Sequence, residues 1–134
     1  MSFTVELLKF FHVLVALTLF GFVLANLLTQ LMTPKQILSP RIDQLSLLLC
    51  VLLMITASML VVPEGYTFTT PWINAAFIYL AVVMLQLVLA CVLKVKKPPV
   101  STWVLLLNYG MMIVILMGII HDAVTKHTLW ASWY

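Results

Sequence analysis

Four long stretches without a charged residue fill most of this chain, and they limit its fold more than any other feature. No Lys, Arg, Asp or Glu lies within residues 10–34, 44–63, 65–93 or 98–121. Each stretch holds the ~20 mostly apolar residues that a helix needs to cross a bilayer. A helix of a soluble protein instead keeps one polar face toward water. The pattern therefore predicts an all-α integral membrane protein with four transmembrane helices.

Proline and capping residues indicate where each predicted helix begins and ends. Pro34 ends the first helix, because proline lacks a backbone N–H and disfavours helix in the residue before it. Ser39 before Pro40, and Thr70 before Pro71, are typical helix starts, with a capping side chain ahead of a proline in the first turn. The predicted helices span residues of about 5–32, 40–62, 71–94 and 102–124.

Short connectors separate the predicted helices, so consecutive helices are expected to be antiparallel neighbours in an up-down four-helix bundle. Residues 1–134 then form a single four-helix domain. The 7 Lys and Arg residues lie near helix ends, where such charges set orientation in a membrane and do not indicate nucleic-acid binding. The expected partner is the lipid bilayer, and a homodimer or a larger membrane complex is compatible with the pattern.

Basic residues are distributed unequally between the two sides of the predicted bundle. Lys9 and Lys126 lie on the side of the termini, and the other side carries Lys35, Arg41, Lys94, Lys96 and Lys97. Loops rich in Lys and Arg stay in the cytoplasm. The bias predicts a multi-pass protein of a bacterial inner (plasma) membrane, with both termini in the periplasm.

His12 is the first candidate functional residue, because ionisable side chains inside a membrane helix are rare and usually functional. At 100° per residue, Lys9, Asn26 and Gln30 fall on the same helix face as His12. We expect this polar stripe to face the bundle interior, since lipid cannot satisfy it. The structural alternative is a seam of interhelical hydrogen bonds without chemistry.

His121 ends the fourth predicted helix on the same side of the membrane as His12, and Met117 lies one turn before it. Thioether and imidazole ligands suit Cu(I), so His12, His121 and Met117 are a candidate copper site, with Met59 as a further soft ligand. A b-type haem is the alternative cofactor. Such a haem could lie between His12 and His121, but Met117 is closer to the depth of His12 than His121 is. The expected ligands are therefore His12 with Met117 or Met59, or His12 alone.

Short motifs along the chain resemble the CopD-like and HemJ-like small bacterial membrane proteins. They are Leu-Leu-Lys-Phe-Phe-His at residues 7–12, Phe-Thr-Thr-Pro-Trp at 68–72 and Ile-His-Asp-Ala-Val-Thr-Lys at 120–126. The resemblance implies a compact helical bundle with His12 as the shared functional histidine. It implies copper handling in CopD-like proteins, and haem-dependent protoporphyrinogen oxidation in HemJ-like proteins.

The chain departs from the HemJ-like pattern after Pro71-Trp72, where Asn74, Ala75 and Ala76 stand in place of a basic residue. The sequence therefore favours a CopD-like role in copper homeostasis, in which Cu(I) is captured from the outer side and passed between the helices. Haem-dependent oxidoreductase activity is the second hypothesis for the function, and a role as an accessory structural subunit of a larger membrane complex is the third. No motif for hydrolysis or phosphoryl transfer is present in the sequence.

Overall fold

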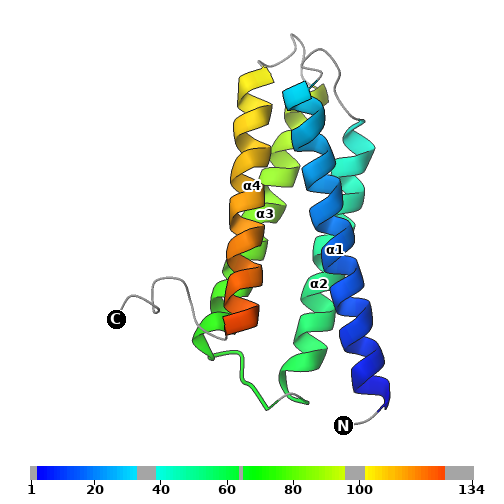
Figure 1. The fold of residues 1–134 in the computed structure, drawn as a ribbon, viewed down its shortest axis with the longest axis vertical. Helices are drawn as coiled ribbons and strands as arrows, with labels where there is room; N and C mark the ends of the chain where they lie inside the picture. Colours follow the sequence, from blue (N-terminus) through cyan, green and yellow to red (C-terminus); the bar gives the residue numbers. More distant parts are fainter. Residues whose placement is uncertain (1–2, 33–38, 64, 96–101, 126–134) are drawn as a thin grey trace.

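The fold was obtained as a computed structural model that describes residues 3–32, 39–63, 65–95 and 102–125 (Figure 1). These residues form four helices, and the described part of the chain contains no strand. The helices are α1 (Phe3–Met32), α2 (Pro40–Val61), α3 (Pro71–Val95) and α4 (Thr102–Thr125). All four are long and apolar enough to cross a membrane. The predicted all-α membrane bundle is confirmed, and each helix begins and ends within two residues of its predicted range.

Local capping explains the described helix boundaries. The Ser39 side chain accepts a hydrogen bond from the backbone N–H of Arg41 at 3.2 Å, and Pro40 occupies the first helical position of α2. After α2, Gly65 adopts a φ of 81°, which favours glycine, and its N–H bonds the carbonyl of Val62 at 2.9 Å. The chain then turns into the short loop that leads to α3.

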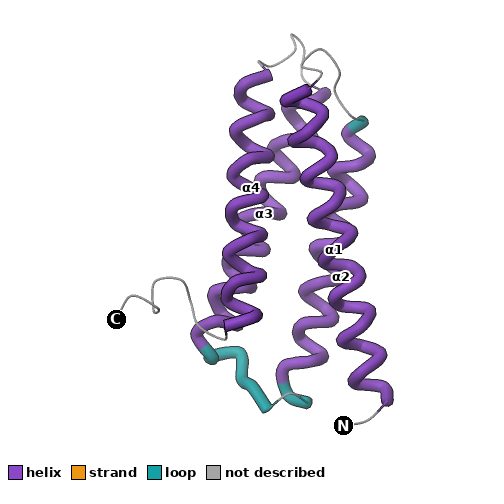
Figure 2. The backbone as a smooth tube through the Cα atoms, viewed as in Figure 1, coloured by secondary structure: helices purple, strands orange, loops and turns teal. Residues whose placement is uncertain are grey.

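The helices run up and down, and each packs against the next, while α1 also packs against α4 (Figure 2). This arrangement closes a four-helix ring around one apolar core. The largest fully buried apolar side chains include Leu19, Val23, Leu87, Leu105 and Met112. The core runs along the centre of the bundle and draws on all four helices, with Cys50 and Leu53 contributed by α2.

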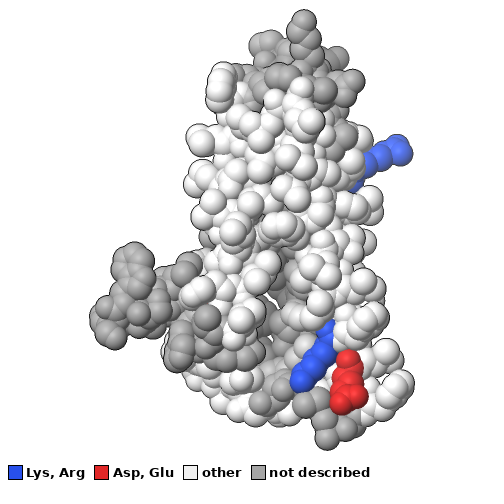
Figure 3. All heavy atoms as spheres, in the orientation of Figure 1, with Lys and Arg blue, Asp and Glu red and all other residues white. Residues whose placement is uncertain are grey.

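The outside of the bundle is also apolar. Large hydrophobic side chains such as Leu17, Leu85 and Trp103 are 63%, 71% and 77% exposed. On the face shown in Figure 3, the described surface is almost entirely uncharged. An exterior of this kind fits acyl chains and would be unstable in water. The chain is a multi-pass membrane protein.

The two ends of the bundle differ in packing. We call them the His12 end, where α1 begins and α4 ends, and the Lys94 end, where α3 ends. Toward the His12 end, α4 and α1 diverge, whereas they lie close together at the opposite end (Figure 1). Each end holds one of the two polar sites described below.

Candidate functional site: the His12 cavity and the Lys94 network

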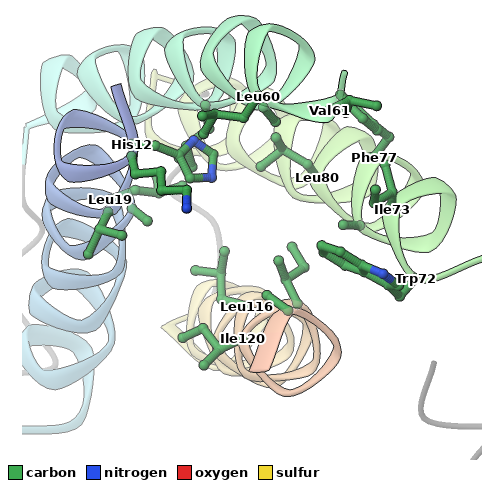
Figure 4. Close-up of a pocket in the computed structure, with 18 of the residues that line it drawn as sticks. His12, Leu19, Leu60, Val61, Trp72, Ile73, Phe77, Leu80, Leu116 and Ile120 are labelled. Atoms are coloured by element: carbon green, nitrogen blue, oxygen red, sulfur yellow. The ribbon is translucent and has the colours of Figure 1, made fainter. Parts of the chain in front are cut away.

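A cavity of about 520 Å³ lies between the helices at the His12 end (Figure 4). Its walls are mainly apolar, with aromatic rings that include Phe77 and Trp72 of α3. Its polar groups include Lys9 and His12 of α1, which are one helical turn apart, and Tyr66 of the loop before α3. The volume is within the range of ~300–1,000 Å³ that is usual for small-molecule and cofactor sites.

Four leucines separate this cavity from the centre of the bundle. On α2, α3 and α4 the lining residue nearest to the middle of the bundle is a buried leucine, and on α1 a buried leucine directly precedes the innermost lining residue. These residues form what we call the leucine layer: Leu19 of α1, Leu53 of α2, Leu80 of α3 and Leu116 of α4. The cavity is therefore closed toward the Lys94 end by apolar side chains.

His12 projects into the cavity from α1 (Figure 4) and is fixed by Thr56 of α2. The ring Nδ1 lies 2.5 Å from the Thr56 hydroxyl oxygen. That hydroxyl also lies 2.9 Å and 3.1 Å from the carbonyl oxygens of Leu52 and Leu53. The hydroxyl has one proton, so either it or Nδ1 can be the donor of the bond to His12, according to the tautomer of the ring. When the hydroxyl proton goes to a carbonyl, Nδ1–H donates to the hydroxyl oxygen, and in the neutral ring Nε2 is then the nitrogen with a lone pair for a ligand.

The polar stripe predicted on α1 faces the interior, but it is divided between two sites. His12 and Lys9 line the cavity, whereas Asn26 and Gln30 are buried near the other end of the bundle. Thr56 was not predicted as a partner of His12. The available signal was its hydroxyl in an otherwise apolar stretch of α2, but the sequence alone does not pair positions on two helices.

Of the four predicted copper ligands, only His12 lines the cavity. Met59 is 56% exposed and Met117 is 57% exposed, so both lie largely on the outside of the bundle. Leu116 and Ile120 of α4 do line the cavity, and Met117 is turned about 100° from Leu116. His121 contacts its neighbour instead, with Nδ1 3.0 Å from a carboxylate oxygen of Asp122.

A metal site is not evident elsewhere in the described ranges. No group of three or more His, Cys, Asp or Glu side chains in those ranges could hold a metal ion. The proposed Cu(I) ligation by His12, His121, Met117 and Met59 therefore stays a prediction from sequence. The structure does not bring the four side chains together around the cavity.

A second polar site, which we call the Lys94 network, connects all four helices near the other end of the bundle. It consists of Asn26 of α1, Asp43 of α2, Lys94 of α3 and Tyr109 of α4, and all four are buried or nearly so. The Lys94 Nζ lies 2.8 Å from Oδ2 of Asp43 and donates to Oδ1 of Asn26 at 2.8 Å. The Tyr109 hydroxyl donates to Oδ1 of Asp43 at 2.5 Å.

The network satisfies its buried charges from several directions. Lys94 Nζ also lies 5.2 Å from the centroid of the Tyr109 ring, within the range of a cation–π contact. The Asn26 amide nitrogen donates to the carbonyl of Phe22 at 3.1 Å. Charges that are buried without partners would be very costly in a membrane interior. The pairing of Asp43 with Lys94 was not predicted, because charges near helix ends look like orientation signals.

Comparisons with known proteins found no match to this chain among protein-family models, curated proteins or solved structures. What the His12 cavity binds is therefore inferred from its own geometry and chemistry.

Proposed function

We propose that this chain is a membrane protein that binds b-type haem in the His12 cavity, with His12 as the axial ligand. The observation that carries the proposal is the position of His12, whose ring lines an apolar cavity of about 520 Å³ and is held at Nδ1 by Thr56, so that Nε2 is the nitrogen available to a ligand. A histidine nitrogen inside an apolar pocket is the usual protein ligand of b-type haem. Apolar and aromatic walls suit the macrocycle.

The chain's own residues divide the work of holding such a group. Thr56 holds the ring orientation of His12 through Nδ1, as outer hydrogen-bond partners do for metal-binding histidines. Lys9 lines the same cavity one turn from His12, where its ammonium group suits a carboxylate of the ligand. The leucine layer keeps water from reaching the site from the centre of the bundle. When bound, haem supplies one-electron or oxygen chemistry.

The copper reading requires ligands that the cavity lining does not offer in this arrangement. Cu(I) prefers thiolate, thioether and imidazole donors. Among the described lining residues, His12 is the only side chain of these types. Met59 and Met117 would have to turn inward to join it. Haem needs only one protein ligand, so the geometry favours haem over Cu(I).

We place the protein in a bacterial plasma membrane with both termini outside the cytoplasm, on the basis of the bias in basic residues. In this orientation the His12 cavity lies in the outer half of the bilayer. The Lys94 network then lies in the cytoplasmic half. A topology measurement described in the Discussion tests this placement.

An absorbance spectrum of the protein purified from haem-supplied cells tests the proposal. The wild type is expected to show a reduced-minus-oxidised haem spectrum, and His12→Ala is expected to lose it. His121→Ala and Met117→Leu are matched controls that should retain it, because neither side chain lines the cavity. A wild type without haem that binds Cu(I) in a chelator competition would overturn the haem proposal and favour the copper reading.

A further inference from the structure

The His12 cavity has two exposed apolar residues on its lining, and they mark where it opens. Val13 of α1 is 54% exposed and Ile120 of α4 is 50% exposed, yet both line the cavity. A residue that faces both a cavity and the outside lies at the mouth of that cavity. The other large hydrophobic lining residues are less exposed. The mouth is therefore flanked by α1 and α4.

The packing of the helices agrees with an opening on this side. Of the four neighbouring helix pairs, α1 and α4 pack least closely, and they diverge toward the His12 end (Figure 1). The space-filling view is hollowed between these two helices in the same half of the molecule (Figure 3). Trp72 projects from the start of α3 toward α4 (Figure 4), so the α3–α4 side is covered.

The surroundings of this mouth are those of a lipid-facing surface. Leu17 of α1 and Val114 of α4 are 63% and 68% exposed, and both belong to helices that flank the mouth. A ligand that came from water through this side would have to cross acyl chains and the apolar side chains at the mouth. A ligand that is already dissolved in the bilayer would meet only apolar contacts on the way.

The polar groups of the cavity orient such a ligand. Lys9 begins the lining on α1 and Tyr66 belongs to the loop before α3, so both lie toward the membrane surface. The leucine layer lies at the deep end. We infer that His12 receives its ligand sideways from one leaflet, between Val13 and Ile120, as an anionic amphiphile whose acidic end stays near Lys9. This inference rests on the proposed function, in which that amphiphile is haem.

The first test measures the rate of haem loading. Apo-protein in nanodiscs is mixed with vesicles that contain haem, and the haem absorbance band is followed with time. In the double variant Val13→Trp/Ile120→Trp, the larger side chains at the mouth should slow haem loading by ~10-fold or more. This corresponds to an increase of about 1.4 kcal/mol in the activation barrier. The control is Leu17→Trp/Val114→Trp, which adds the same bulk to lipid-facing positions outside the lining and should load at the wild-type rate. Equal rates for both double variants would overturn the inference.

A second test does not depend on haem. A spin label is attached to Ala16→Cys, a half-buried lining position, in a chain whose Cys50 and Cys91 are replaced by alanine. Lipid-dissolved oxygen should relax this label more than an aqueous nickel chelate does, and the double tryptophan variant should lose the oxygen effect. A label at Leu17→Cys is the control and should keep that effect.

The two tests separate the two proposals. Haem binding would be refuted if the wild type never takes up haem. The lateral opening would still stand if the cavity label responds to oxygen in the chain with Val13 and Ile120 but not in the double tryptophan variant. A cavity label that responds mainly to the aqueous chelate would refute the lateral opening, whether or not haem binds.

Discussion

Replacing Lys94 with methionine should destabilise the bundle more than any other single exchange in the Lys94 network. The exchange removes the 2.8 Å ion pair with Asp43, the 2.8 Å hydrogen bond to Asn26 and the cation–π contact with Tyr109. Asp43 is then a fully buried carboxylate whose remaining hydrogen bond comes from Tyr109. Breaking one side of a buried ion pair typically costs ~3–5 kcal/mol. This is a large share of a total stability of about 5–15 kcal/mol.

Replacing the other partner of the ion pair, Asp43→Asn, should lower the free energy of unfolding by less than Lys94→Met does. The asparagine oxygen can still accept from Tyr109, and Lys94 lies in the last turn of α3, from which its long side chain can extend toward the headgroups. The double variant Asp43→Asn/Lys94→Met removes both charges and should recover to within about 1–2 kcal/mol of the wild type. Arg41→Met is the matched control, because Arg41 is an exposed cation near the same end, and its loss should cost less than ~0.5 kcal/mol.

Reversible unfolding in mixed detergent micelles, followed by circular dichroism, gives the free energies of unfolding of the wild type, the two single variants, the double variant and the Arg41→Met control. The difference between the double variant and the sum of the single variants is the coupling energy of the pair. Two outcomes would refute the reasoning. One is a Lys94→Met protein as stable as the Arg41→Met control, and the other is a double variant whose loss equals the sum of the single losses.

Three further measurements test other parts of the structure. Thr56→Val should weaken haem binding ~10–100-fold in a titration of the apo-protein, because it removes the hydrogen-bond partner that orients the His12 ring, and unchanged affinity would argue against that role. Leu87→Ala should lower the free energy of unfolding by ~2–5 kcal/mol, because Leu87 is fully buried, while the lipid-facing control Leu85→Ala should have little effect; similar losses would contradict the described packing. An alkaline phosphatase fused after Tyr134 should be active in the periplasm and one fused after Lys96 inactive, and the opposite pattern would reverse the proposed orientation.

The sequence was sufficient for the helices because their signals are local. An uncharged run of about 20 residues must span the bilayer, and a capping residue before proline marks a helix start, as at Ser39 before α2. Thr70 also precedes the helix start at Pro71, although its hydroxyl accepts from the N–H of Thr67. These signals predicted the number, order and boundaries of the helices. The connector lengths were enough to predict the antiparallel packing.

Whether each side chain faces the core or the lipid was much harder to predict, because these helices are apolar on every side. In a soluble protein the polar face shows which side is out, but lipid and core both accept Met117, so its sequence position does not reveal that it lies outside. Polar residues are more informative, and the buried positions of Asn26 and Gln30 were predicted for that reason. The contact of Asp43 with Lys94 depends on the relative rotation of α2 and α3, which short sequence patterns do not encode.

The leucine layer has a consequence for how the protein experiences membrane voltage. Between the cavity and the Lys94 network, most of the described core side chains are apolar, such as Val23, Val83 and Leu87, all fully buried, and Asn108 donates a hydrogen bond to the carbonyl of Gln86 in the same segment. An electric potential falls mainly across the low-dielectric part of its path, and moving one charge through the whole drop corresponds to ~2.3 kcal/mol per 100 mV. This mostly apolar segment therefore takes part of the potential drop. The His12 cavity has apolar walls and opens toward acyl chains, so it lies within the same low-dielectric path. A charged ligand at His12 therefore feels part of the potential drop, and its affinity should change by a fraction of that energy when the membrane is energised.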